Sequence, residues 1–245
     1  MDHKIFLAGA SGVIGRRLGP LLVAAGYEVF GTTRSSVKAN ELEALGVKPI
    51  VIDVFDGPGL SLVLTTVQPD VVIHQLTDLP RGLPPSQMAE ATVRNARMRR
   101  EGTANLVAAA RAASARRLIA QSIAWAYAPG AESHLETDSL DHNAEGTRRI
   151  SVQGVAALER LTLSSPPIEG VVLRYGQLYG PATGNDQPNG SASVHVDAAA
   201  QAALLAITHG QTGIYNIAED TGFVSSAKAR KDLGWRDDFR IAEAS

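Results

Sequence analysis

The sequence predicts an α/β fold, namely a doubly wound parallel sheet of the Rossmann type with a small C-terminal subdomain. Over the first two thirds of the 245 residues, short apolar runs alternate with longer segments of helical periodicity. The runs are rich in β-branched residues and almost continuously apolar, as strands covered on both faces of a parallel sheet are. A glycine-rich turn joins the first run to the first helical segment. Such alternation builds right-handed βαβ units, and we expect the strand order 3-2-1-4-5-6.

The apolar runs are predicted as six strands, in chain order Lys4–Ala8, Glu28–Thr32, Pro49–Val54, Asp70–Gln75, Arg117–Ser122 and Gly170–Tyr175. Apolar residues at helical spacing predict five helices, at Ile14–Ala25, Val37–Leu45, Gly59–Val67, Ser86–Ala113 and Glu145–Leu163. Each predicted helix separates two predicted strands. The helices are therefore expected to cover both faces of the sheet.

After Tyr175 this alternation stops. Residues 181–193 are rich in Gly, Pro, Asn and Ser, which predicts a loop. The elements expected beyond the loop are a strand at Val194–Val196, a helix at Ala198–Thr208 with Asp197 as its N-cap, a strand at Gly213–Ala218 and a helix at Ser225–Leu233. They are too few for a domain of ordinary size. We interpret them as a small appendage that crosses back over the sheet.

The composition excludes several classes of function. The 23 Lys and Arg residues nearly balance 25 Asp and Glu residues, so no basic excess favours nucleic acid or an anionic membrane as a partner. The chain has no cysteine, which excludes disulfides, thiolate zinc sites and cysteine nucleophiles. The histidines show no pair at helix-face spacing, so no metal site is expected. With neither a signal-peptide pattern nor an apolar run of about 20 residues, we expect a cytoplasmic location and no membrane contact.

The glycine-rich turn has the spacing of a phosphate-binding loop. Gly9 permits the tight turn after the first strand, Gly12 lets a pyrophosphate approach the backbone, and Gly15 lets the helix pack on the sheet. Backbone N–H groups at the start of the helix then bind phosphate. A dinucleotide is therefore the predicted ligand, held by Gly9, Ser11, Gly12, Val13, Ile14 and Gly15. The alternative is a tight turn that binds no ligand.

The end of the second predicted strand discriminates between the two nicotinamide cofactors. An acidic residue there would bind the ribose hydroxyls of NAD and repel a 2′-phosphate. This chain has Arg34 instead, whose guanidinium suits a phosphate, with the hydroxyls of Thr33, Ser35 and Ser36 beside it. One of the two arginines directly after Gly15 would close the other side. NADP(H) is the predicted cofactor, with NAD(H) as the alternative.

Several motifs in a fixed order carry a family resemblance. They are the three glycines, Asp53 after the third strand, Val71-Val72-Ile73-His74, Gly102-Thr103-x-Asn105-Leu106, Ser122 after the fifth strand, Leu173-Arg174-Tyr175-Gly176, Tyr179-Gly180-Pro181, Val194-His195-Val196-Asp197 and Leu233-Gly234-Trp235. Together they resemble the extended short-chain dehydrogenase/reductase family, the NAD(P)-dependent epimerase/dehydratase group. The resemblance implies that Asp53 and Val54 flank the adenine and that Gln75, Leu76 and Thr77 line the cofactor beyond the fourth strand.

The chain departs from this family at its catalytic residues. Members normally carry a catalytic Tyr, and a Lys four residues later, on the helix after the fifth strand. The resemblance places Ser151 and Val155 at these positions, and neither can act as the acid or supply the cation. Ile123 takes the place of the catalytic Ser or Thr, which leaves Ser122 as the nearest hydroxyl. An asparagine common in the fourth helix is Arg99 here.

These observations lead to two hypotheses. The first is an NADP(H)-dependent oxidoreductase or isomerase of a small carbonyl or sugar-like substrate, with Ser122 and Tyr127 as candidate catalytic residues. Ser122 is expected to hydrogen-bond a substrate oxygen, while a proton would come from Tyr127, His134, His142 or water. The second hypothesis is a dinucleotide-binding redox sensor without catalysis. In both, residues 1–178 form the dinucleotide-binding domain and residues 179–245 form the substrate-side appendage, interleaved with it.

The family resemblance also implies a homodimer. Its interface would be formed by the helices predicted within residues 86–113 and 145–163, each pairing with its symmetry mate in a four-helix bundle. The alternative is a monomer in which these helices only cover the sheet.

Overall fold

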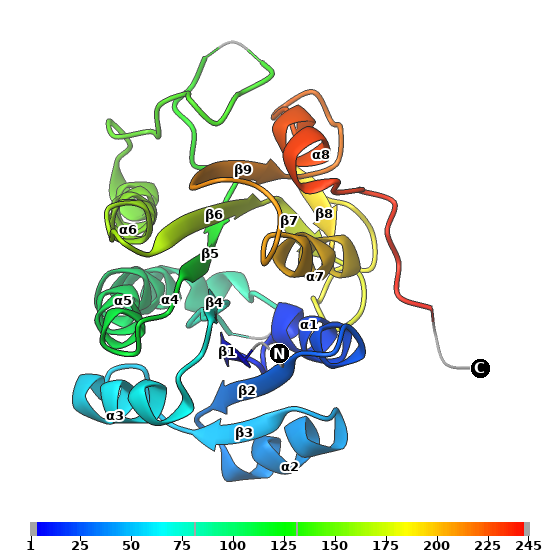
Figure 1. Cartoon of the computed structure of the whole chain (residues 1–245). Coiled ribbons are helices and arrows are strands. Elements are labelled where there is room, and N and C mark those ends of the chain that lie inside the picture. Colours follow the sequence, from blue (N-terminus) through cyan, green and yellow to red (C-terminus); the bar gives the residue numbers. More distant parts are fainter. Residues whose placement is uncertain (1–3, 81, 131, 243–245) are drawn as a thin grey trace.

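The computed structural model describes residues 4–80, 82–130 and 132–242 of the chain. At its centre lies a seven-stranded sheet in the order β3-β2-β1-β4-β5-β6-β9, in which every neighbouring pair is parallel (Figure 1). The strands are β1 (Lys4–Ala8), β2 (Glu28–Thr33), β3 (Lys48–Val51), β4 (Val71–His74), β5 (Arg117–Ile123), β6 (Glu169–Tyr175) and β9 (Gly213–Ile217). The predicted fold class and the order of the first six strands are confirmed.

Helices form a layer on each face of the sheet (Figure 1). One layer contains α3 (Gly57–Val67), α4 (Pro85–Arg97), α5 (Thr103–Ala112) and α6 (Gly146–Leu163). The other contains α1 (Val13–Ala24), α2 (Ser36–Ala44) and α7 (Val196–Leu205), with α8 (Ala227–Leu233) beside β9. Both faces of the sheet are thus covered, as a doubly wound fold requires.

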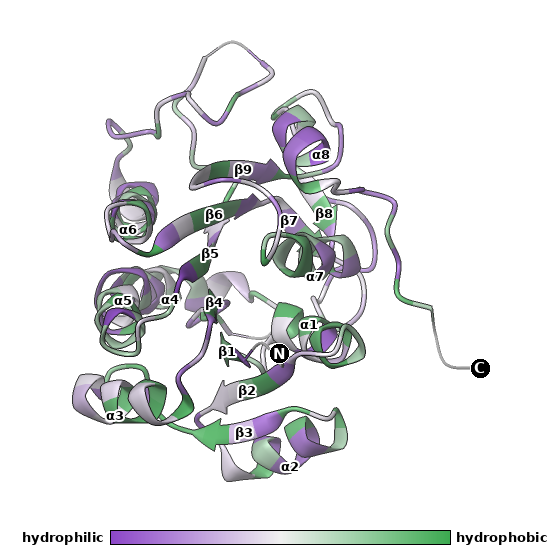
Figure 2. Ribbon diagram, viewed as in Figure 1, coloured by the Kyte–Doolittle hydropathy of each residue, from purple (hydrophilic) through white to green (hydrophobic). Residues whose placement is uncertain are grey.

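Strand β1 shows how the sequence produces these two cores. Because successive side chains of a strand point to opposite faces, Ile5 and Leu7 join the apolar cluster under α1 and α7. Phe6 and Ala8 join the cluster under α3 and α5. Figure 2 shows the apolar residues along the central strands. A strand buried on both faces has to be continuously apolar, which is why the runs were recognisable in the sequence.

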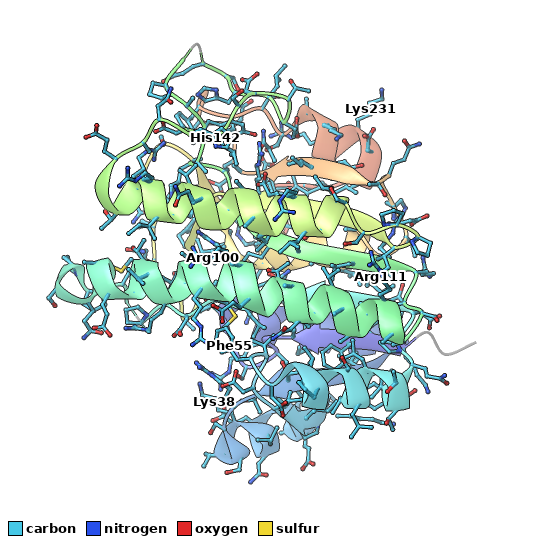
Figure 3. The ribbon with its side chains drawn as sticks, turned by 90° about the vertical axis from the view of Figure 1, so that its left-hand side faces the viewer. Lys38, Phe55, Arg100, Arg111, His142 and Lys231 are labelled. Atoms are coloured by element: carbon cyan, nitrogen blue, oxygen red, sulfur yellow. The ribbon has the colours of Figure 1, made fainter. Side chains whose placement is uncertain are left out.

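The long helical segment predicted at Ser86–Ala113 forms as one run, but it is not uniform. Between α4 and α5 lies a π-helical turn, Met98–Gly102, which continues the helix without a break (Figure 3). Such turns insert an extra residue into an α-helix and are frequent at functional sites. Here the turn contains Arg99, the residue that departs from the family pattern.

The region after residue 175 differs from its prediction in three respects. Strand β9 extends the main sheet beside β6, whereas we expected residues 213–218 in the appendage. Outside the main sheet, β7 (Gln177–Tyr179) and β8 (Ser193–His195) form a separate pair. The helix starts at Val196, so its N-cap is His195 and not Asp197. Asp197 is in the first turn, where its carboxylate accepts from Arg17 at 2.6 Å. The proposed division at residue 178 stays a prediction.

Within the described residues, no helix combines the length and the apolarity that crossing a membrane requires. The same part of the chain holds no group of three or more His, Asp or Glu side chains arranged to bind a metal ion.

Candidate active site

The turn between β1 and α1 has the geometry of a phosphate-binding loop. Gly9 has φ +90°, a left-handed conformation that favours glycine, and an added Cβ would lie 2.8 Å from the Gln75 carbonyl oxygen. At Gly15 an added Cβ would lie 2.2 Å from the Gly9 carbonyl oxygen. Gly12 is exposed and precedes α1, whose first N–H groups receive no side-chain cap. These N–H groups are therefore free to bind an anion.

Hydroxyl groups connect this loop to the end of β2. The Gly9 N–H donates to Thr32 Oγ1 at 3.1 Å, and Ser11 Oγ donates to Thr33 Oγ1 at 3.2 Å. The Ser35 N–H donates to the same Thr33 oxygen at 3.2 Å. The loop and the cofactor-discriminating segment after β2 therefore form one connected unit.

Three arginines were candidates for binding a cofactor phosphate. Arg34 is exposed beside the cavity described below and makes no hydrogen bond or ion pair with any described residue. Arg16 also lines this cavity and pairs with Glu41. Arg17 points elsewhere and pairs with Asp197. Arg34 is thus the cation most available to a ligand at the end of β2.

A cavity of about 840 Å³ runs along the carboxyl ends of the central strands, and it is large enough for a cofactor-sized ligand. Of the residues predicted to bind cofactor, it is lined by Gly9, Ser11, Gly12, Val13, Ile14, Arg34, Val54, Gln75, Leu76 and Thr77. Gly15 and Asp53 lie outside. Strand β3 ends at Val51, earlier than predicted, and the exposed Asp53 carboxylate accepts from the Phe55 N–H at 3.0 Å.

The inner end of the cavity lies where β4, β5 and β6 terminate. Gln75 Nε2 donates to the Tyr175 hydroxyl at 3.2 Å, while Gln75 Oε1 is buried without a partner among the described residues. Burial raises the pKa of Tyr175 well above its usual range, so the phenol stays protonated. An unpartnered buried acceptor in the wall of a cavity fits a ligand that donates an N–H or O–H group. Together with the uncapped start of α1, it fits a bound dinucleotide.

Ser122 lines the cavity, but its hydroxyl already has a partner inside the protein. Ser122 Oγ donates to Glu159 Oε1 at 2.7 Å, and the side chain is buried. Glu159 in turn accepts from Arg174 at 2.8 and 2.7 Å, so that a buried carboxylate is held by a buried guanidinium. The expected hydrogen bond from Ser122 to a substrate oxygen would have to replace this one. The catalytic role of Ser122 stays a prediction.

Tyr127 lies outside the cavity. Its hydroxyl donates to Asn216 Oδ1 at 2.7 Å. Its ring stacks on the His134 ring, with the two ring centroids 4.8 Å apart. Burial raises the pKa of Tyr127, an effect that the Arg174 charge partly opposes. His134 is buried in this stack, and His142 is exposed away from the cavity. None of these three predicted proton donors therefore lines the cavity, and the contacts of Tyr127 favour a packing role.

The positions that the family resemblance assigns to the Tyr and Lys pair lie on α6, which contains no tyrosine and no lysine. Val155 is fully buried. Ser151 accepts a hydrogen bond at its Oγ from Arg99 Nη1 at 3.2 Å. Arg99 lines the cavity together with Trp125. The sequence marked Arg99 as a departure but did not predict it as a site residue, because its direction depends on the π-helical turn.

Comparison with known proteins agrees with this geometry. The chain matches the model of the NAD dependent epimerase/dehydratase family over residues 5–194. It is 40% identical over 241 residues to a 3-diazoavenalumate denitrifying reductase from a Streptomyces species, a match that covers 89% of this chain and 76% of that protein.

Solved structures share the fold. The PbgP3 protein from Burkholderia pseudomallei superposes with a TM-score of 0.79 at 16% identity. The match covers 98% of this chain and 93% of the PbgP3 chain. UDP-glucose 4-epimerase from Thermus thermophilus, in complex with NAD, superposes with a TM-score of 0.75 at 20% identity, and the match covers 97% of this chain and 95% of the epimerase. The chain belongs to the NAD-dependent epimerase/dehydratase family and is an NAD(P)-dependent enzyme of the oxidoreductase and epimerase type.

Proposed function

We propose that the chain is an NADP(H)-dependent reductase that removes a diazo group from an aromatic substrate. The observation that carries this proposal is a cofactor-sized cavity with an intact phosphate loop beside a helix, α6, that has no tyrosine and no lysine, since Ser151 and Val155 occupy the catalytic positions. The 40% identical relative is named as a reductase that denitrifies a diazo compound, which supports the choice of substrate class.

Different residues of the cavity would bind the different groups of the cofactor. The N–H groups of Val13 and Ile14 would hold the pyrophosphate, and Arg34 with Lys38 would hold a 2′-phosphate. Gln75 Oε1 would accept a hydrogen bond from the nicotinamide end. When bound, the reduced cofactor supplies a hydride.

The absence of the catalytic tyrosine favours one substrate class over the other. Reduction of a carbonyl group to an alcohol needs a hydride on carbon and a proton on oxygen, so the protein or water has to supply a proton. An arenediazonium ion that gains a hydride at its terminal nitrogen becomes a neutral aryldiazene, which then loses dinitrogen and keeps that hydrogen on the arene carbon. This second conversion balances without a proton from the protein. A site with serine and valine in place of the Tyr and Lys pair is suited to it.

A panel of electrophiles tests the proposal. NADPH oxidation is followed with benzenediazonium, with benzaldehyde and with the keto sugar nucleotide UDP-4-keto-6-deoxyglucose, and the rate without protein is subtracted in each case. We expect the protein to accelerate only the diazonium reaction, with release of dinitrogen. Acceleration with the aldehyde or the sugar nucleotide alone would reject the proposal in favour of a carbonyl or sugar-like substrate. Binding of NADPH without turnover of any compound would favour the redox sensor.

Arg34 is predicted to set the cofactor preference. Since Arg34 has no partner among the described residues and a charge-assisted hydrogen bond contributes about 1.5–3 kcal/mol, NADPH should bind at least tenfold more tightly than NADH. In Arg34→Ala most of this difference should disappear. Calorimetric titration with both cofactors measures it, and Arg111→Ala, on the exposed surface of α5 (Figure 3), is the control. Equal affinities of the unmodified protein for the two cofactors contradict the assignment.

We also propose that the chain forms a homodimer through α4, α5 and α6. These helices lie side by side, and no other element of the described chain covers their outer face (Figure 3). Among their large apolar side chains only Val93 is exposed, so the interface would be largely polar. Light scattering at micromolar concentration should give twice the chain mass of 25.8 kDa. A single species at the chain mass rejects the dimer.

A further inference from the structure

Arg99 is a buried cation in the wall of the cavity. Its side chain is only 7% exposed, and it is held there by the π-helical turn Met98–Gly102. It lines the inner end of the cavity together with Gln75, Ser122 and Trp125. The adjacent Arg100 is exposed on the outer surface (Figure 3). Of these two consecutive arginines in the π-helical turn, one is thus buried at the cavity and the other is exposed.

The guanidinium of Arg99 lacks the partner that buried arginines normally have. Its Nη1 donates to Ser151 Oγ at 3.2 Å and to the Ser151 carbonyl oxygen at 3.5 Å. No carboxylate of the described residues lies within ion-pair distance of it. The two other strongly buried arginines do have such partners, since Arg174 pairs with Glu159 at 2.7 Å and Arg117 with Glu169 at 2.8 Å.

A buried charge without a counter-charge is costly and is usually compensated by a ligand or a partner. The negative charge of Glu159 attracts the Arg99 charge from a distance, but this carboxylate is already bound by Arg174 and Ser122. Burial lowers the pKa of Arg99 to about 10, which still leaves it charged at neutral pH. Its remaining N–H groups are available to an anion that enters the cavity. The phosphate groups of a dinucleotide would have their own partners in the phosphate loop and in Arg34, which also line this cavity.

We propose that Arg99 binds an anionic oxygen, a carboxylate or a phenolate, of an aromatic substrate at the inner end of the cavity. The inference rests on the proposed function and specifies its substrate class further. Val155 on α6 cannot supply a positive charge. Arg99 supplies one from the π-helical turn between α4 and α5, which packs against α6. The aromatic ring would lie beside Trp125, an aromatic side chain in the same wall.

Binding of small anions to the NADP⁺-saturated protein tests this directly. Calorimetry compares two pairs of similar shape, benzoate with benzamide and 4-nitrophenolate with 4-nitroaniline, at a pH where the phenol is ionised. At least one anion should bind about tenfold or more tightly than its neutral counterpart, as expected for a charge-assisted hydrogen bond. The pair that shows the difference identifies the carboxylate or the phenolate as the bound group. Equal binding within both pairs overturns the proposal.

Variants locate the effect. Arg99→Gln should abolish the preference for the anion, Arg99→Lys should retain part of it, and Arg100→Gln should leave it unchanged. NADP⁺ affinity is measured first and shows whether each variant is folded. If Arg99→Gln is not folded, the reduced anion preference of Arg99→Lys provides the test instead. A preference that persists in Arg99→Gln assigns the anion to another residue and overturns the proposal. These measurements need no turnover, so they can succeed or fail independently of the diazo reductase assignment.

Discussion

Replacing Glu159 by glutamine is expected to lower the free energy of unfolding by about 3–5 kcal/mol. The substitution leaves Arg174, whose side chain is 3% exposed, without its bidentate carboxylate. The amide keeps one acceptor oxygen for Ser122 Oγ or Arg174, but its NH2 group would face a donor where the second carboxylate oxygen now accepts. A buried cation that loses its partner has no access to water to replace it, and the whole desolvation cost then falls on the folded state. Urea unfolding followed by circular dichroism measures the change.

Two further variants serve as controls for Glu159→Gln. In Glu169→Gln the lost carboxylate is half exposed, and its partner Arg117 keeps three backbone carbonyl acceptors, at Ala206, His209 and Gly210. The loss there should stay within about 1 kcal/mol, as for surface pairs. Ser122→Ala should also cost about 1 kcal/mol, the value of one hydrogen bond. Equal losses for Glu159→Gln and Glu169→Gln would contradict the account of the buried pair.

The second large effect is expected at the phosphate loop, where Gly15 and Gly12 form a matched pair. In Gly15→Ala the new methyl group would meet the carbonyl oxygens of Gly9 and Ala10 at 2.2 and 2.6 Å, so the loop backbone has to move. We expect a loss of stability of about 1–3 kcal/mol, typical of overpacking, together with a loss of NADPH affinity. Both follow from one displacement, because Gly9 is part of the cavity wall.

In Gly12→Ala the methyl group would approach only the Gly9 carbonyl oxygen, at 3.2 Å, and would otherwise face the cavity. Stability should therefore change by less than about 1 kcal/mol, whereas NADPH affinity should fall at least tenfold because the pyrophosphate can no longer approach the backbone. Thermal unfolding and calorimetric titration separate the two effects. Tight NADPH binding by Gly12→Ala would place the phosphates elsewhere.

The sequence was most informative where one local pattern determines the structure. The runs around Phe6, Val72 and Leu118 had to be apolar because both faces of their strands are covered, and these strands were predicted correctly. The glycine spacing at residues 9–15 is a local pattern too, because Gly12 and Gly15 are required by carbonyl oxygens of the same turn. Strand β9 was assigned to the appendage because nothing in Gly213–Ile217 indicates that its neighbour is β6.

The inner end of the cavity was less predictable, because it depends on contacts between distant segments. The partner of Ser122 is Glu159, 37 residues away, and that of Tyr127 is Asn216, 89 residues away. Neither pairing leaves a signal in the local sequence. Asp197 resembled an N-cap by residue type, but its partner is Arg17 in α1. Arg99 was visible as an unusual residue, while its inward direction depends on a π-helical turn that no local motif indicated.

If this site reduces a diazo group without an acid from the protein, a single turnover has to convert NADPH and the diazonium ion in equal amounts. Protein saturated with NADPH is mixed with a smaller amount of benzenediazonium, and NADP⁺, benzene and dinitrogen are measured after quenching. We expect equal amounts of all three, and the same yield from Ser151→Ala. Consumption of the diazonium without matching NADP⁺ and benzene, or a loss of the reaction in Ser151→Ala, would show that the site does not perform this conversion.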